Sequence, residues 1–228
     1  MKTVFLLLIS LLLFADDKVL MHIDFKGISN TQDATQVLVQ KGFEFQIDKK
    51  DFHFYIQDEK LYVETDKKAA VLFGKILHGK KALKNPAYAL IEWGVERFPK
   101  GADWENGNNR LPIGLVMVFG TEKLSSGIPS FIAPRVPTFL CPFIGEKEKV
   151  DKKYLGKLYK KGGRYYCVSN QKDILIRTEF DIDKHYVKEF KKRTPEITAF
   201  AFQVNTLNTE GGAKVFIKSF TVYAKDKK

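Results

Sequence analysis

The feature that most constrains this chain is an alternation of apolar and polar residues over positions 87–96. Ile91 and Trp93 fall on one face of such a segment, and Glu92 and Glu96 fall on the other. A Pro-Lys-Gly sequence follows and ends the pattern. The segment therefore predicts a half-buried β-strand, with an indole that anchors its core face.

Similar patterns recur along the chain and predict its fold class. One apolar run, 113–119, has strand length without alternation, which predicts a central strand covered on both faces. A helix is predicted at 184–192, with Asp183 as its N-cap, whereas 29–40 fits either a short helix or an irregular crossing. The remaining strand candidates are 19–25, 42–47, 51–56, 60–65, 69–77, 136–143, 164–169, 173–182, 197–204 and 214–224. With no alternation of strands and helices, these segments predict an all-β, antiparallel jelly-roll-like β-sandwich with one short helix.

The first 15 residues resemble a secretion signal. Lys2 precedes an apolar run that ends at Ala15, and the run is shorter than the roughly 20 residues that a membrane-spanning helix needs. We therefore predict a signal peptide at 1–15, a single β-sandwich domain at 16–228 and a periplasmic or secreted location. An uncleaved membrane anchor is the alternative. The mature chain is expected to have no transmembrane segment.

The net charge of +11 bears on the class of partner. Arginine, the usual residue for bidentate phosphate recognition, is scarce among the 38 basic residues, and the lysines are scattered in short pairs. This ratio of lysine to arginine argues against a nucleic-acid partner. It fits either a solvated lysine surface or an anionic component of the cell envelope.

Two cysteines, Cys141 and Cys167, allow two interpretations. In an oxidising compartment a disulfide between them could add about 3 kcal/mol of stability. Both residues also lie in apolar, strand-like contexts, which fits two buried free thiols equally. The sequence leaves this choice open.

The most ligand-like stretch follows the strand at 87–96. A tryptophan there, beside amides and a guanidinium, would suit a sugar, because an indole can stack on a sugar ring while polar groups bond its hydroxyls. Ordinary turn chemistry is the alternative, since Asp and Asn favour turns. The predicted ligand-binding residues are Asp103, Trp104, Asn108, Asn109 and Arg110.

Carboxylates offer a second hypothesis, a carbohydrate-active enzyme that uses Glu92 or Glu96 with Asp103. Four residues along a strand separate Cα atoms by roughly 13 Å. Glycosidases hold their carboxyl groups about 5–9.5 Å apart. This spacing disfavours Glu92 and Glu96 as a catalytic pair and favours a solvated strand face with lysine partners.

Calcium is the one cofactor for which the sequence offers candidate ligands. Alternating acids at Glu179, Asp181 and Asp183, with Asn205 and Asn208, could supply oxygen ligands. No dense calcium-loop motif is present, and the four histidines lack zinc-ligand spacing. We therefore predict no metal site.

The order of motifs over 40–224 resembles the exported bacterial family numbered domain-of-unknown-function 3047. The matching segments are 70–74, 90–93, 101–104, 108–119, 177–190, 202–206 and 211–212. Two features depart from the family pattern. Asn108 and Asn109 replace its acidic pair, and Ile91 replaces the first Trp of its strand. The resemblance implies a β-sandwich similar to carbohydrate-binding modules and no established activity.

Together these features predict an exported, non-catalytic β-sandwich that binds glycan or another envelope ligand through the Trp104 loop and the Glu92 face. The alternatives are the carbohydrate-active enzyme and a structural envelope module that binds another protein. The oligomeric state stays open.

Overall fold

The computed structural model describes residues 18–47, 49–77, 79–124, 135–157 and 159–224. The predicted signal peptide at 1–15 lies outside the described residues. No helix within these ranges is long and apolar enough to cross a membrane.

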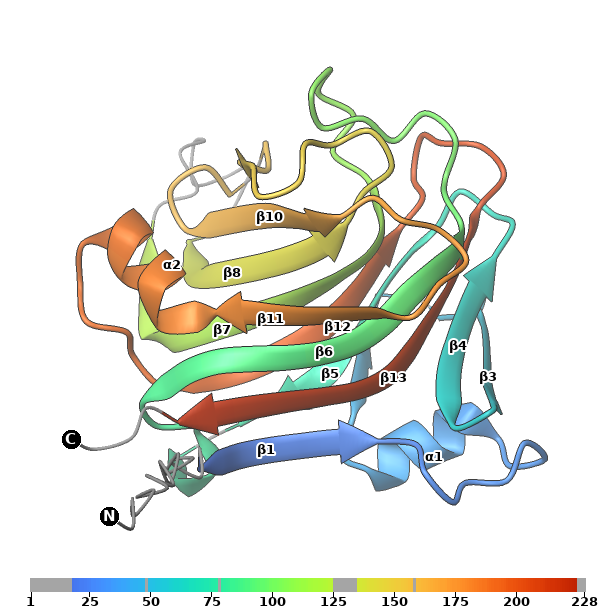
Figure 1. Cartoon of the computed structure of the whole chain (residues 1–228), viewed down its shortest axis with the longest axis horizontal. Coiled ribbons are helices and arrows are strands. Elements are labelled where there is room, and N and C mark those ends of the chain that lie inside the picture. The colour runs from blue at the N-terminus through green and yellow to red at the C-terminus, as the bar shows by residue number, and fades with distance from the viewer. Residues whose placement is uncertain (1–17, 48, 78, 125–134, 158, 225–228) are drawn as a thin grey trace, which may run out of the picture.

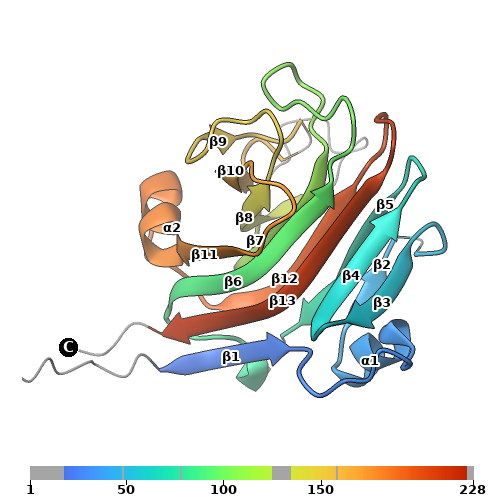
Figure 2. The ribbon, with the colours of Figure 1, turned by 45° about the vertical axis from the view of Figure 1, so that its right-hand side comes forward.

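Two β-sheets pack face to face (Figures 1 and 2). The first runs in the order β11-β6-β13-β4-β3, and β1 also pairs with β13. Its strands are β1 (Val19–Asp24), β3 (His53–Gln57), β4 (Lys60–Thr65), β6 (Pro86–Arg97), β11 (Ile176–Asp181) and β13 (Ala213–Ala224). We call it the six-stranded sheet.

The other, seven-stranded sheet has the order β2-β5-β12-β7-β8-β10-β9. Its strands are β2 (Glu44–Gln46), β5 (Ala70–Ile76), β7 (Leu111–Leu124), β8 (Val136–Ile144), β9 (Lys153–Tyr154), β10 (Gly163–Ser169) and β12 (Ile197–Asn205). The predicted β-sandwich is confirmed. Its described strand pairs are antiparallel, except that β8 and β10 run parallel. β7 lies between β12 and β8, so the central position predicted for 113–119 is also confirmed.

Strand β6 has the predicted orientation. Ile91, Trp93 and Val95 are fully buried between the sheets. The indole Nε1–H of Trp93 donates a hydrogen bond to Thr178 Oγ1 on the neighbouring β11, at 3.0 Å. A buried indole needs such a partner for its polar atom, and the β11 register supplies one.

The helices partly differ from the prediction. Helix α2 (Ile182–Phe190) begins earlier than expected, because Asp181, not Asp183, is the N-cap and accepts a hydrogen bond from Lys184 N at 2.8 Å. Within 29–40, the short-helix alternative is confirmed, because helix α1 (Ala34–Gln40) forms there with Asp33 as its N-cap. A 3₁₀ turn, η1, covers Gly79–Lys81. The two α-helices lie on opposite sides of the sandwich (Figures 1 and 2).

Two groups of buried side chains stabilise the fold. The larger fills the space between the sheets. A smaller one, which we call the outer cluster, lies on the other face of the seven-stranded sheet and contains Trp104, Leu111, Phe139, Cys141, Phe143, Tyr154, Tyr165 and Cys167. The segment 145–157 helps to cover this face, because it contributes the edge strand β9 with the buried Tyr154 and, before it, the buried Glu148.

Both cysteines are buried free thiols, so the structure contradicts the candidate disulfide between Cys141 and Cys167. In the parallel pair β8–β10, Cys141 lies opposite Tyr165, whereas Cys167 lies opposite Phe143. A two-residue stagger across neighbouring strands separates Cα atoms by about 8 Å. Disulfides need less than about 7 Å, so the register keeps the thiols apart. Burial raises the pKa of Cys141 well above its usual value and that of Cys167 to about 11.

Candidate ligand-binding site

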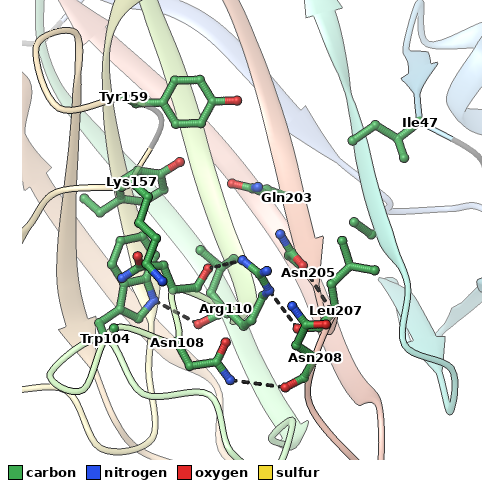
Figure 3. Close-up of a pocket in the computed structure, with 16 residues that line it drawn as sticks. Ile47, Trp104, Asn108, Arg110, Lys157, Tyr159, Gln203, Asn205, Leu207 and Asn208 are labelled. Carbon is green, nitrogen blue, oxygen red and sulfur yellow. Dashed lines mark hydrogen bonds between the residues drawn. The ribbon is translucent and has the colours of Figure 1, made fainter. Parts of the chain in front are cut away.

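A cavity of about 440 Å³ opens beside the outer cluster, on the outer face of the seven-stranded sheet (Figure 3). This volume is in the range of small-ligand sites. Strands β5, β7, β10 and β12 and four loops contribute to it. We call it the amide cavity, because side-chain amides dominate its polar lining. Its residues are Ile47, Ala70, Trp104, Gly107, Asn108, Asn109, Arg110, Leu111, Gly156, Lys157, Tyr159, Tyr165, Gln203, Asn205, Leu207 and Asn208.

Trp104 lines the cavity but is not the exposed platform that the sequence suggested. Its side chain belongs to the outer cluster, with ring centroids 4.6 Å from Tyr165 and 5.3 Å from Phe143, and only 6% of the residue is exposed. Its Nε1–H donates to the carbonyl of Arg110 at 2.8 Å. The expected stacking role is therefore wrong, because aromatic residues from β8 and β10 enclose the indole.

Asn108 and Arg110 join the loop after β6 to the loop between β12 and β13. Asn108 Nδ2 donates to the carbonyls of Gly101 (2.6 Å) and Asn208 (3.2 Å). Arg110 Nε donates to the carbonyl of Leu207 at 2.7 Å. These two predicted site residues thus hold the cavity wall in place and line it as well. Asn109 also lines the cavity, and its carbonyl accepts a bond from Arg110 Nη1 at 3.1 Å.

Strand β12 supplies the floor. Phe202 and Val204 point into the main core, so Gln203 and Asn205 point outward into the amide cavity. The Oε1 atom of Gln203 is buried and has no hydrogen-bond partner among the residues that the structure describes. An unpaired buried acceptor costs about 1–3 kcal/mol, so this oxygen is suited to accept a bond from a ligand hydroxyl or a water molecule.

Sequence reasoning missed the other wall. Tyr159 is half-buried, with its ring edge-on to Phe139 at 5.5 Å, and Lys157 is exposed. Figure 3 shows Tyr159 and Ile47 on opposite sides of the cavity, with Gln203 between them. The local sequence around Tyr159 is lysine-rich, and only the path of 145–161 over the sheet brings this ring to the site.

The acidic residues of the enzyme hypothesis lie elsewhere. Glu92 and Glu96 are on the outer face of the six-stranded sheet, where Glu96 pairs with Lys214 at 2.8 Å and Glu92 accepts a bond from Ser219 Oγ at 2.8 Å. Asp103 bonds Asn106 through both carboxylate oxygens, and these bonds lower the pKa of Asp103. None of these three acids lines the amide cavity. The residues of the enzyme hypothesis therefore lie outside this candidate site.

The calcium candidates are also separated. Asp181 caps α2, and Asp183 accepts a bond from Thr194 Oγ1 at 2.6 Å. Asn205 and Asn208 line the amide cavity, whereas Glu179 borders a different cavity, of about 360 Å³, between β10 and β11. In the described ranges, no group of three or more His, Cys, Asp or Glu side chains could hold a metal ion.

Comparison with known proteins gives only distant similarities. No family model matches the chain, and no curated protein matches it. A family 29 carbohydrate binding module from Piromyces equi shares 10% identity, with 90% of this chain and 91% of that chain covered and a TM-score of 0.38. Endoglucanase 3 of family GH12 from Trichoderma harzianum shares 8%, with 79% and 96% covered and a TM-score of 0.41. At such low identity, function has to be inferred from this chain's own residues.

Proposed function

We propose that this chain is an exported, non-catalytic protein that binds a neutral glycan in the amide cavity. The buried, unpartnered Oε1 of Gln203 carries the proposal. An amide oxygen only accepts hydrogen bonds, so it favours a hydroxyl over a carboxylate or phosphate oxygen. The export part rests on the predicted signal sequence at 1–15.

The rest of the lining supports a sugar. The side chains of Asn108, Asn109, Asn205 and Asn208 add amide groups, which both donate and accept hydrogen bonds, as sugar hydroxyls do. Tyr159 presents a half-buried ring on which an apolar sugar face can pack. None of the described lining residues is a carboxylate, the group that glycosidases use for acid–base hydrolysis of a glycoside.

A second cavity suggests that the ligand is a chain of sugars. It lies along the same outer face and is lined by Leu72, Gly74 and Ala201, among others. Gln203 pairs with Leu72, and Ala201 pairs with Gly74, so the two cavities are consecutive along β5 and β12. This arrangement supports an elongated oligosaccharide that starts in the amide cavity.

The test is a glycan array with the purified protein, followed by calorimetry with the best oligosaccharide. We expect neutral oligosaccharides to be retained, and Gln203→Ala to weaken binding about tenfold, the effect of one good hydrogen bond. Gln57→Ala is the matched control, because Gln57 is exposed on β3 of the other sheet. An array with no bound glycan, or equal binding by Gln203→Ala and the parent protein, would refute the proposal.

A further inference from the structure

A third cavity, of about 820 Å³, has a different chemistry. Residues from the start of β1, the end of α1, the end of β5 and the region of η1 line it. Strand β1 and helix α1 lie in the lower part of Figure 1. Its described lining includes no carboxylate and five lysines, Lys41, Lys75, Lys80, Lys81 and Lys84. We call it the lysine cavity. The basic turn that contains Lys80 and Lys81 has no part in the proposed glycan site.

The five lysines gather more positive charge than the acidic residues of the described ranges offset. None of the ion pairs in the described ranges uses any of the five lysines. Asp24 lies near enough to Lys41 for its pKa to be affected, but its carboxylate is already bonded to His22 Nε2 at 3.0 Å. The pKa of Lys75 is lowered, first by burial and then by the charges of Lys41 and Lys81. The positive charges of these lysines therefore lie around the same cavity.

Two of the ammonium groups are held in place. The Nζ atom of Lys75 lies 5.7 Å from the ring centroid of Phe43, and that of Lys41 lies 5.9 Å from the ring centroid of Phe25. The Lys75 stem also passes close to Gly42, where a Cβ atom would meet Lys75 Cε at 3.2 Å. The cavity thus combines two half-buried, positioned lysines with three exposed ones.

We propose that the lysine cavity binds an anion that carries several phosphate charges. Lysine binds phosphate as a point charge, and five ammonium groups need more negative charge than one carboxylate supplies. Apolar lining residues such as Leu20, Met21 and Leu83 leave room for an uncharged part of the ligand. A free polyphosphate and a phospholipid headgroup share this chemistry.

The test compares two double variants of the full chain with the same charge change. Lys80→Glu with Lys81→Glu alters the cavity, whereas Lys67→Glu with Lys68→Glu alters exposed lysines that do not line it. Inorganic tripolyphosphate, measured by calorimetry, probes free phosphate. Sedimentation with vesicles that contain cardiolipin, an anionic lipid whose headgroup carries two phosphates, against phosphatidylcholine vesicles, probes a headgroup.

We expect at least one probe to bind, and the cavity variant to weaken that binding about tenfold or more while the control variant retains it. Binding of tripolyphosphate alone would assign the site to a free phosphate ligand, and binding of the anionic vesicles alone would assign it to a headgroup. Failure of both probes, or an equal loss in the two variants, would overturn the proposal. Gln203→Ala should leave this binding unchanged, which separates it from the glycan site.

Discussion

The outer faces of the two sheets carry the same alternating sequence pattern, but their side chains have different surroundings in the folded protein. On the six-stranded sheet, polar side chains are satisfied by their cross-strand neighbours, as in the pair Glu96–Lys214. Tyr55 and Tyr62 stack there at 4.9 Å, and burial, with the nearby Glu96 carboxylate, raises the pKa of Tyr62 to about 12. On the seven-stranded sheet, distant segments cover part of the face and enclose the amide cavity.

This difference shows where a binding site can arise on a sandwich. Cross-strand pairs complete each other's hydrogen bonds and leave little for a ligand. Where a crossing segment covers part of a strand face, a polar atom such as Gln203 Oε1 lines the enclosed cavity and has no partner among the described residues. The covered face therefore combines a cavity with a buried acceptor that a ligand can satisfy.

The largest effect is expected from the covered face. Trp104→Ala should destabilise the protein by about 3–5 kcal/mol, because it empties the centre of the outer cluster. Tyr55→Ala, on the open face, should cost only about 1 kcal/mol. Urea denaturation of both variants measures the contrast. Equal losses would mean that the outer cluster adds no more stability than the Tyr55–Tyr62 pair on the open face.

A smaller effect is expected at the ion pairs that join α2 to β9 and β10. Glu189 has a side chain only 7% exposed and contacts Lys153 at 2.8 Å and Arg164 at 3.0 Å. Burial by itself would raise the pKa of Glu189, but hydrogen bonds from Lys153 and Arg164 help to outweigh it and lower the pKa below 4.5. Glu189→Gln should therefore cost about 2 kcal/mol at neutral pH.

The pH dependence of that loss follows from the sign of the shift. A carboxyl whose folded-state pKa is lowered stabilises the fold above its ordinary pKa of 4.5, and this stability is lost as pH falls through the folded-state value. The difference between Glu189→Gln and the parent protein should be full at neutral pH and shrink in acid. Denaturation at a series of pH values measures it, and a difference that is constant down to acid pH would contradict this role.

Asn108→Ala should cost about 1 kcal/mol, because it removes two hydrogen bonds that join the loops at the mouth of the amide cavity. Limited proteolysis should show faster cleavage near Asn208. Asn106→Ala is a control in the same loop, since its side chain bonds only to Asp103 among described residues. If Asn108→Ala leaves both stability and cleavage unchanged, the loops are held by other contacts.

The smallest effect is expected on the open face. Glu92→Gln with Glu96→Gln should change stability by about 1 kcal/mol or less, because both carboxylates are partly exposed. Glycan binding should stay at the parent level, as calorimetry can check. A loss of binding in this variant would move the ligand to the six-stranded sheet and revive the role that the sequence suggested for Glu92.

The sequence by itself determined the local structure of this protein. A period of two residues places Ile91, Trp93 and Val95 on the buried face of β6, and the apolar run in β7 marks the centre of its sheet. The hairpin between β3 and β4 was also predictable, although not the positive φ angles of Asp58 and Glu59. These features depend on neighbours along the chain, which the sequence shows directly.

Only the tertiary structure decided what each outer face does. Trp104 was predicted to meet a ligand and is enclosed by Tyr165 and Phe143, because 145–161 crosses the sheet and β10 returns parallel to β8. The same path brings Tyr159 opposite Gln203. The sequence pattern shows which side chains point away from the core. Long-range contacts decide whether those side chains face solvent, pair with a lysine or pack against another segment.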